Sequence, residues 1–410
     1  MPKKKTTLLM TVGTGIGGEE ATDSLAHGML FSIDNYNPDE IIFLGSELSK
    51  KTIDSVKKQY NDKFDEELDY YEFIQLDEID DFKIYFEAFR SEILKHSDSK
   101  IIIDYTSGTK TMTMAAAFAS MVFRKNLFFI TGERDEGVVK RGTEKIVTQN
   151  LYPIYDDLEI IKIKELFNAN RFESGKVLID YLVGGSEDKQ VLLQLFDAYE
   201  AFDNVNYEEA KNNFDVKSFV DAWPELTKEF QNNIKALNIL NNKKHQLRCY
   251  YILASMLNNA RRRSEENKYD DAIARLYRSL ELIAQIKLKK DYNIVTSDVD
   301  IDILKEKQLN DEYIESLELT RDSKSKIKLG LVQDYLLLNE LDDELGHFYI
   351  ENEKLIQNSL QLRNGSILAH GLKSQNKQQY EEFNDLVLKA AHVLNKDISK
   401  FIDETMFPEF

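Results

Sequence analysis

Apolar residues follow two different periods along the chain, and the change between them predicts two structural regions. Over roughly the first 155 residues, short apolar runs alternate with amphipathic stretches, which is typical of a parallel sheet with helices on both faces. The runs Ile101–Ile103 and Phe128–Ile130 are continuously apolar, as strands buried on both faces should be. The predicted strands are Thr7–Val12, Glu40–Leu44, Tyr71–Gln75, Lys100–Asp104, Leu127–Ile130 and Lys145–Tyr152. The predicted helices between them are Glu20–Ile33, Ser49–Tyr60, Phe82–His96 and Thr109–Arg124.

From about Asp157 the alternation stops, and apolar residues recur with helical spacing almost to the end of the chain. The run Tyr269–Tyr277 looks like half a tetratricopeptide hairpin, but no fixed period repeats it, so a solenoid is not expected. The sequence therefore predicts an α/β Rossmann-like N-terminal domain followed by an all-α C-terminal region. The predicted helices of that region are Ile160–Phe167, Lys176–Leu182, Val191–Phe202, Tyr207–Phe214, Ser218–Asn233, His245–Asn267, Tyr269–Leu288, Asp311–Ser316, Gly330–Leu338, Glu353–His370 and Gln378–Phe401.

Composition and charge limit which classes of molecule the protein can bind. The 410 residues carry a net charge of −19, which argues against tight binding of duplex DNA but leaves room for a small anion or a short RNA. We expect the basic clusters Arg261–Arg263 and Lys289–Lys290 to lie on solvated helix faces. The single cysteine, Cys249, suits a reducing compartment, and the apolar run Leu8–Val12 is too short for a signal peptide or a membrane span. A cytoplasmic protein with no membrane partner is expected.

Three turns follow predicted strands and should therefore lie at the carboxyl edge of the sheet, where open α/β sheets bind ligands. They are Gly13–Gly18, Gly45–Glu47 and Thr106–Thr111. Glycines expose backbone amides to a phosphate, and the third turn adds four hydroxyls and Lys110. The turn Gly13–Gly18 matches the G-x-G-x-x-G pattern of dinucleotide-binding folds, but the acidic residue expected at the end of the second strand is missing. The turn Thr106–Thr111 resembles a P-loop but lacks its glycine spacing. Plain helix-capping turns remain the alternative, above all at Gly45–Ser46.

The segment Arg363–Gly371 holds the candidate catalytic residues. Arg363 and His370 are seven residues apart, so on one helix they would project from the same face. Arg363 would supply a permanent cation and His370 a group that titrates near neutrality, a combination that suits cleavage of a phosphodiester without a metal. Asn364 would be a positioning group. No metal site is expected, because the acidic clusters lack EF-hand spacing and are interpreted as loops and helix starts. Those clusters are Asp77–Asp81, Asp298–Asp302 and Asp342–Glu344.

Several of these segments resemble one known family. The run Asp104–Lys110 after an apolar strand resembles the signature of CARF domains, the CRISPR-associated Rossmann-like sensors, and Thr11–Gly15 is similar to their other ligand-facing turn. Arg363 and His370, with six residues between them, resemble the R-x(4–6)-H motif of HEPN ribonucleases. The run Asn259–Arg263 followed by Tyr269–Leu282 resembles the helical body of one CARF–HEPN subfamily.

The resemblance implies a homodimeric, metal-independent ribonuclease of type III CRISPR defence that cleaves single-stranded RNA and needs no cofactor other than its activator, a cyclic tetra- or hexa-adenylate. It implies a CARF sensor at 1–157, a helical linker at 158–245 and a HEPN domain at 246–410. Arg363, Asn364 and His370 would be catalytic, in a site composed of both protomers. The expected ligand contacts are Thr11, Gly13, Thr14, Gly15, Ser46, Thr106, Ser107, Gly108, Thr109 and Lys110. Two alternatives stay open: a regulator that has lost catalysis, and a sensor that also degrades its activator.

Overall fold

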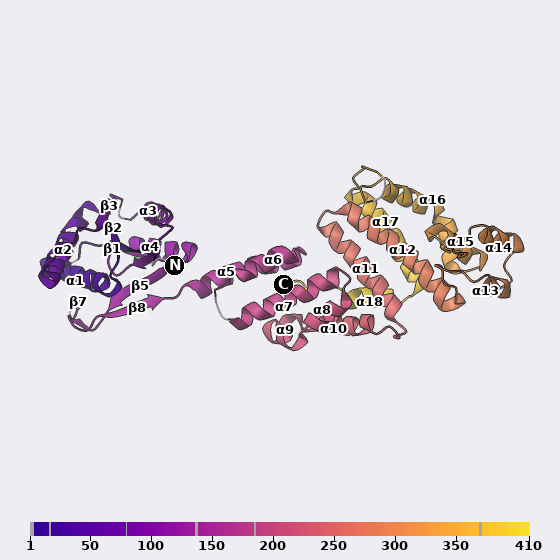
Figure 1. Cartoon of the computed structure of the whole chain (residues 1–410), viewed down its shortest axis with the longest axis horizontal. Coiled ribbons are helices and arrows are strands. Elements are labelled where there is room, and N and C mark those ends of the chain that lie inside the picture. The colour runs from indigo at the N-terminus through magenta and orange to yellow at the C-terminus, as the bar shows by residue number, and fades with distance from the viewer. Residues whose placement is uncertain (1–3, 16–17, 79, 136–137, 184–185, 369–370) are drawn as a thin grey trace. The chain divides into compact units, whose positions relative to one another are not determined.

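The computed structural model describes every residue except 1–3, 16–17, 79, 136–137, 184–185 and 369–370. It divides into two compact units, Met1–Glu159 and Ile160–Phe410. The first combines a sheet with helices and the second is helical (Figure 1), which confirms the predicted fold class.

The first unit is built on a sheet with the strand order β3-β2-β1-β4-β5-β8. Its strands are β1 (Thr6–Val12), β2 (Glu40–Gly45), β3 (Tyr71–Gln75), β4 (Lys100–Asp104), β5 (Asn126–Thr131) and β8 (Lys145–Gln149). The first five are parallel, and β8 pairs antiparallel with β5 at the edge. All six predicted strands form, but the last was predicted too long, because Tyr152 begins a helix. The short hairpin of β6 (Arg134–Asp135) and β7 (Val138–Val139) was not predicted, since two-residue strands carry no readable period.

Helices cover both faces of this sheet. Successive side chains of β1 point to opposite faces, so Leu8 and Met10 join one buried cluster while Leu9 joins the other. The first cluster includes Met29 and Val56 of the helices α1 and α2, and the second includes Phe89 and residues of α3 and α4. The helices are α1 (Glu19–Tyr36), α2 (Lys50–Phe64), α3 (Phe82–Lys95) and α4 (Lys110–Phe123), with a 3-10 turn, η1, at Glu47–Ser49.

The second unit packs helices around one continuous apolar core that runs from Ile163 to Phe401. Its first helix, α5, begins at Tyr152 in the first unit. The helices are α5 (Tyr152–Asn168), α6 (Phe172–Asp180), α7 (Ser186–Asp203), α8 (Tyr207–Asn213), α9 (Val216–Ala222), η2 (Pro224–Leu226), α10 (Thr227–Asn241), α11 (Arg248–Glu265), α12 (Tyr269–Tyr292), α13 (Ile301–Glu306), α14 (Asp311–Glu318), α15 (Leu331–Glu340), α16 (Glu344–Asn364), α17 (Lys377–Leu394) and α18 (Ile398–Glu404). The predicted helix Glu353–His370 is wrong at both ends, because α16 starts at Glu344 and stops at Asn364.

Residues 406–410 pack back onto the beginning of this unit. The ring of Phe407 lies 4.8 Å from Tyr199, and that of Phe410 lies 5.0 Å from Phe167, centroid to centroid. The amide of Asn168 bonds the backbone of Phe410 twice, at 2.9 and 3.0 Å. The last residues of the chain therefore complete the core formed by α5, α6 and α7, and Figure 1 shows that end of the chain among these helices.

Candidate functional site

The carboxyl ends of β1 and β4 lie side by side at the centre of the sheet. From β1 the chain continues to β2 on one side, and from β4 it continues to β5 on the other. Such a reversal of strand order opens a crevice between the two loops that leave the strands. The loops are those that begin at Gly13 and at Tyr105, so the structure brings together the two turns that carry most of the predicted ligand residues.

Direct contacts interlock these two loops. The Gly13 amide donates to Oγ of Ser107 at 2.8 Å, and the Thr11 hydroxyl donates to the Ser107 carbonyl. A Cβ on Gly13 would lie 2.8 Å from the backbone nitrogen of Gly108, so no larger residue fits at position 13 without a shift of the loops. Gly108 itself has φ +112°, a conformation that favours glycine. Thr11 and Ser107 are buried and bonded internally, so they shape the crevice and do not face it.

Other predicted contact residues remain accessible. Thr14, Gly108 and Lys110 are exposed, whereas Gly13, Gly15, Ser46, Thr106 and Thr109 are partly buried. The hydroxyl of Thr109 accepts a hydrogen bond from the amide of Met112 at 3.2 Å and so caps α4. Among the described residues, no carboxylate lies within ion-pair distance of Lys110. The start of α4 thus offers a free ammonium group and a helix N-terminus, both suited to an anion.

Side chains that follow β2 hold the loop after β1 in place by hydrogen bonds. Oγ of Ser49 donates to the carbonyl of Val12 at 2.8 Å, and Oγ1 of Thr52 donates to that of Gly13 at 2.7 Å. The Ser46 amide donates to Oγ of Ser49 at 3.1 Å. The interpretation of Gly45–Ser46 as a capping turn therefore agrees with the local geometry, since Ser46 is the N-cap of the 3-10 turn η1.

Asp104, at the end of β4, was not predicted as part of this site. It is buried beneath the loop, accepts the amide of Thr106 at 2.7 Å and also bonds the Thr106 hydroxyl. The same hydroxyl accepts from the amide of Ile130 at 2.8 Å. Burial raises the pKa of Asp104 to about 6. An acid directly after the apolar run Ile101–Ile103 was the available signal for this residue.

The second candidate site surrounds Arg363 at the end of α16. The guanidinium lies over the ring of Tyr277, 4.8 Å from its centroid, and its Nη1 donates to Oδ1 of Asn364 at 3.0 Å. His370 lies outside the described residues, so its distance from Arg363 is not part of this structure.

The helix that carries Arg363 does not extend to position 370 as the sequence predicted, and the prediction that Arg363 and His370 share a face concerns a residue outside the described ones. The helix ends at Asn364, and the chain then turns back, with the Gly371 amide donating to the Ser366 carbonyl at 3.1 Å. A Cβ on Gly371 would lie 1.9 Å from the carbonyl oxygen of Gly365, so the turn requires glycine there. The periodicity misled because Ile367 and Leu368 continue the apolar spacing past a break at Gly365.

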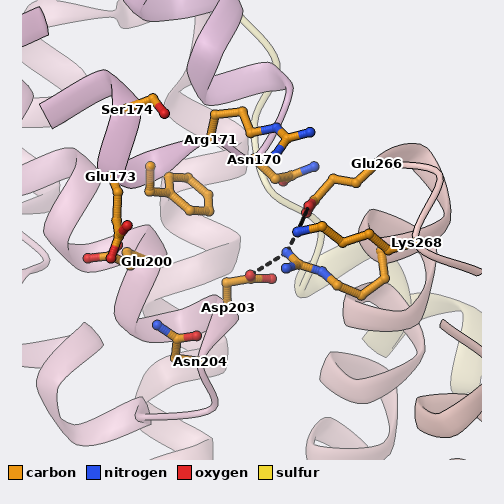
Figure 2. A pocket seen from close by; sticks show the side chains of 11 residues that line it. Asn170, Arg171, Glu173, Ser174, Glu200, Asp203, Asn204, Glu266 and Lys268 are labelled. Carbon is orange, nitrogen blue, oxygen red and sulfur yellow. Dashed lines mark hydrogen bonds and ion pairs between the residues drawn. The ribbon is translucent and has the colours of Figure 1, made fainter. Parts of the chain in front are cut away.

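A cavity of about 270 Å³ lies in the second unit between α6, α7 and the end of α11 (Figure 2). Its lining residues are Asn170, Arg171, Phe172, Glu173, Ser174, Glu200, Asp203, Asn204, Arg263, Glu266 and Lys268. Four of these carry carboxylates and three carry cations. Glu266 pairs with Arg263 at 2.8 Å and with Lys268 at 2.5 Å, so two of the three cations are already neutralised. This cavity is not a site for an anion.

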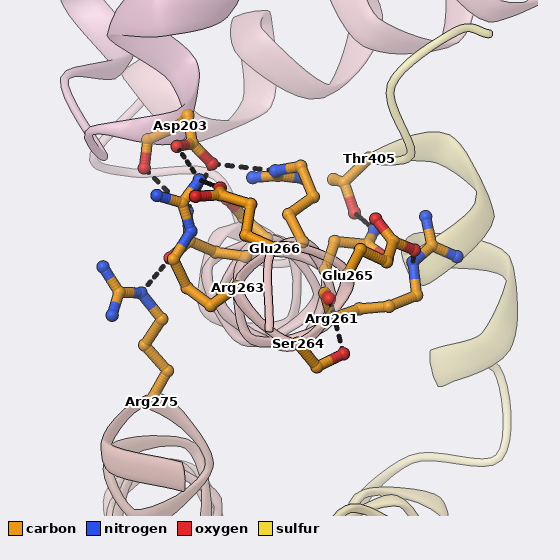
Figure 3. A network of polar contacts seen from close by, with 12 residues as sticks. Asp203, Arg261, Arg263, Ser264, Glu265, Glu266, Arg275 and Thr405 are labelled. Atoms are coloured by element: carbon orange, nitrogen blue, oxygen red, sulfur yellow. Dashed lines mark hydrogen bonds and ion pairs between the residues drawn. The ribbon is translucent and has the colours of Figure 1, made fainter. Parts of the chain in front are cut away.

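The basic cluster Arg261–Arg263 is not a solvated face, contrary to the expectation from sequence. Arg262 is only 3% exposed, and its Nε donates to Asp203 of α7 at 2.8 Å. Figure 3 shows Asp203 and Arg263 within this network of polar contacts. Arg263 pairs with the same carboxylate at 2.5 Å, and the guanidinium of Arg262 also lies 3.7 Å from the ring centroid of Phe407. Arg262 and Arg263 connect α7 to α11 and are not available for RNA, whereas the side chain of Arg261 is 39% exposed and pairs with Glu265 of its own helix.

Within the part of the chain that the structure describes, no group of three or more His, Cys, Asp or Glu side chains converges as metal ligands. Over the same residues, no helix is long and apolar enough to cross a bilayer.

Comparison with known families identifies the family of this chain. Residues 155–247 match the family described as the Csm6 6H domain, and residues 241–394 match the Csm6 HEPN domain. Together the matches span residues 155–394, more than half of the chain. This chain belongs to the Csm6 family of CARF–HEPN CRISPR-associated ribonucleases. The resemblance stated from the sequence is thereby confirmed, and Arg363 falls within the matched HEPN segment.

Solved structures agree at the level of the fold. Csm6 from Enterococcus italicus, bound to cyclic hexa-2′-fluoro-hexa-dAMP, is 14% identical, and the alignment covers 98% of each chain with a TM-score of 0.62. Can2 from Sulfobacillus thermosulfidooxidans, in complex with cyclic tetra-adenylate, is 12% identical over 47% of this chain and 58% of its own. Its TM-score of 0.25 is too low to support an argument. Comparison with curated protein sequences gives no match.

Proposed function

We propose that this Csm6-family chain is a metal-independent endoribonuclease of type III CRISPR antiviral defence, switched on by a cyclic oligoadenylate and specific for single-stranded RNA. The observation that carries the proposal is Arg363, in the matched HEPN segment. Its guanidinium is held by a ring and an amide and pairs with no carboxylate of the described residues. A cation held in place without being neutralised is ready for the phosphate of a substrate.

The sensor would be the crevice between the loops after β1 and β4. Thr14, Gly108 and Lys110 are the exposed contacts for phosphate and ribose groups, and Thr11 and Ser107 hold the loops in register. The fold neighbour from Enterococcus italicus carries a cyclic hexanucleotide, so cyclic hexa-adenylate is the first ring to test and cyclic tetra-adenylate the second.

A homodimer would complete this sensor. On α4, Met114, Phe118 and Val122 are exposed at a spacing of four residues and form an apolar stripe on one face. The stripe begins one turn after Lys110. A second copy packed along it would bring two ligand loops together, as a ring with two-fold symmetry requires.

We assign one role to each of three successive segments of the chain. The sensor would occupy residues 1–157, the transmitting helices 158–245 and the nuclease 246–410, supported by the family matches at 155–247 and 241–394. Ring binding would shift the sensor pair, and the helices would pass this shift to the nuclease.

In the reaction, the 2′-OH of the substrate would attack the adjacent phosphorus. The O2′–P bond forms, the P–O5′ bond breaks, and the products are a 2′,3′-cyclic phosphate and a 5′-hydroxyl. Arg363 would stabilise the charge on the phosphorane oxygens, and Asn364 would orient Arg363. His370 would act as general acid or base, since the ordinary pKa of histidine is roughly 6.5.

The test is cleavage of a fluorescent single-stranded RNA in EDTA, with and without each ring, by wild type, Arg363→Ala and His370→Ala. We expect cleavage that depends on one ring and is lost in both variants while ring binding persists. His347→Ala is the matched control, because His347 lies at the opposite end of the same helix, α16, and should cleave normally. Cleavage that survives Arg363→Ala and His370→Ala would refute the site. Ring binding without any cleavage by the wild type would favour a catalytically inactive regulator.

A further inference from the structure

The contacts of Arg363 hold its guanidinium plane without occupying most of its hydrogen-bond donors. An arginine has five N–H donors, all of which lie in the plane of the guanidinium group. The central carbon of the group lies over the Tyr277 ring, 4.8 Å from its centroid, and this cation–π contact needs none of these donors. Asn364 accepts from Nη1, and among the described residues no other acceptor bonds this guanidinium. A planar fork oriented in this way matches the geometry of a phosphate.

The charged groups around Tyr277 leave the Arg363 cation unneutralised. Glu281, Asp334 and Arg278 lie close enough, with Arg363, to act on the pKa of the Tyr277 hydroxyl, which burial raises first and most. Glu281 is engaged with Arg278 at 2.7 Å.

Asp334 is the other carboxyl group near Tyr277. It is fully buried, and neither oxygen has a hydrogen-bond partner among the described residues. Burial raises its pKa to about 8, so this group is mostly protonated at neutral pH. The two nearby carboxyl groups are thus paired or neutral, and neither competes with a phosphate for Arg363.

Arginines elsewhere in the same unit show the opposite arrangement. Arg262 also lies over an aromatic ring, that of Phe407 at 3.7 Å, but its charge is matched by Asp203 at 2.8 Å and it is buried. Arg363 is stacked and half-buried, with no such carboxylate among the described residues. An arginine that packs on a ring for stability alone would be stabilised further by a carboxylate partner. An arginine that binds a substrate phosphate must keep its charge free of such a partner.

We propose that Tyr277 is a positioning residue for RNA cleavage, and that its ring is the platform that sets the orientation of the Arg363 guanidinium toward the scissile phosphate. The inference rests on the proposed function and assigns a part of the same site. The face of the ring performs this role, so the hydroxyl is dispensable and the aromatic ring is not.

The experiment compares Tyr277→Phe, which keeps the ring, with Tyr277→Leu, which removes it, in the full-length protein. With activating ring and EDTA, Tyr277→Leu should lower kcat about tenfold, within the range that a cation–π contact supplies. KM should change less, and Tyr277→Phe should stay within about twofold of wild type. Tyr250→Leu is the matched control, because Tyr250 also lies under a cation, Lys290, at 4.3 Å. Lys290 is on the same helix as Tyr277, 13 residues further along, and this control should keep the wild-type kcat.

A second measurement separates failure of this inference from failure of the proposed function. Affinity for a 2′-deoxy-substituted, uncleavable oligonucleotide is measured by fluorescence anisotropy, and thermal unfolding shows that the variants fold. Weaker binding by Tyr277→Leu than by Tyr277→Phe supports the platform even if the wild type cleaves nothing, which would refute the proposed activity alone. Equal kcat and equal affinity for the Leu and Phe variants would overturn the inference, as would a Phe variant as impaired as the Leu variant.

Discussion

Replacement of Asp334 by asparagine should make the second unit more stable, and increasingly so as the pH rises. Asp334 lies in the first turn of α15, is fully buried and lacks a hydrogen-bond partner among the described residues. Its folded pKa of about 8 exceeds the ordinary 3.8, first because of burial and then because of Glu281. The folded state therefore holds a proton that the unfolded state releases, and stability falls as pH rises from about 4 to about 8.

The size of the effect follows from the two pKa values. At ~1.36 kcal/mol for each pH unit between them, the loss is about 1–2 kcal/mol at pH 5 and about 5 kcal/mol at pH 8. The positive end of the α15 dipole favours the ionised form by only about 0.3–1 kcal/mol, so burial dominates. Asparagine has no such ionisation. The gain in unfolding free energy for Asp334→Asn should therefore be about 3–4 kcal/mol larger at pH 8 than at pH 5.

Urea unfolding followed by tryptophan fluorescence measures this difference directly. Trp223 is the only tryptophan of the chain and is buried in the second unit, so its signal reports that unit alone. The control is Asp342→Asn, where the carboxylate is 94% exposed and solvent screens its charge, so the variant should behave alike at both pH values. A stability gain for Asp334→Asn that is the same at pH 5 and pH 8 would refute the reasoning.

Three further predictions concern the crevice and the α7–α11 junction. Gly13→Ala should weaken ring binding in calorimetry by about tenfold or more, because its Cβ would overpack Gly108 at 2.8 Å and such clashes typically cost about 1–3 kcal/mol; unchanged affinity would mean that the loops separate freely. Lys110→Ala should also lower ring affinity and should reduce its dependence on salt, and an unaltered salt dependence would place the lysine outside the site. Asp203→Asn should lower the stability reported by tryptophan fluorescence by about 3–5 kcal/mol, because Arg262 would keep a buried charge without a partner; a loss below about 1 kcal/mol would contradict the burial of this pair.

The local pattern of apolar and polar residues was sufficient to predict much of the fold. Strands such as Lys100–Asp104 were predicted to the residue, because a buried parallel strand is a short apolar run with a polar residue at each end. The location of the turns after β1 and β4 could also be predicted, since every turn after a parallel strand lies at the same edge of the sheet. Only the strand order, which places β1 beside β4, makes them neighbours, and that order depends on long-range pairing that no local window contains.

The surroundings of Arg363 were harder to predict from the sequence. Arg363 and Tyr277 are 86 positions apart, and nothing in either segment indicates that one lies over the other. Three successive arginines looked like a basic surface, but their partner Asp203 is 59 residues before Arg262. An ion pair between residues so far apart in the sequence can be recognised only once the packing of the helices is known. The predicted helix was extended past Gly365, although α16 ends at Asn364, because the apolar spacing continues beyond that point.

The packing of residues 406–410 against α5, α6 and α7 has a consequence for biosynthesis. Phe407 and Phe410 contact Phe167 and Tyr199, which leave the ribosome some 200 residues earlier. At about 5–20 residues per second, the helices that begin this unit wait on the order of ten seconds with an aromatic surface uncovered. The first unit has no such dependence, because its core is closed by residue 159. A nascent chain should therefore hold a folded first unit well before the second unit can fold, and chaperones would meet the second unit while its core is still incomplete.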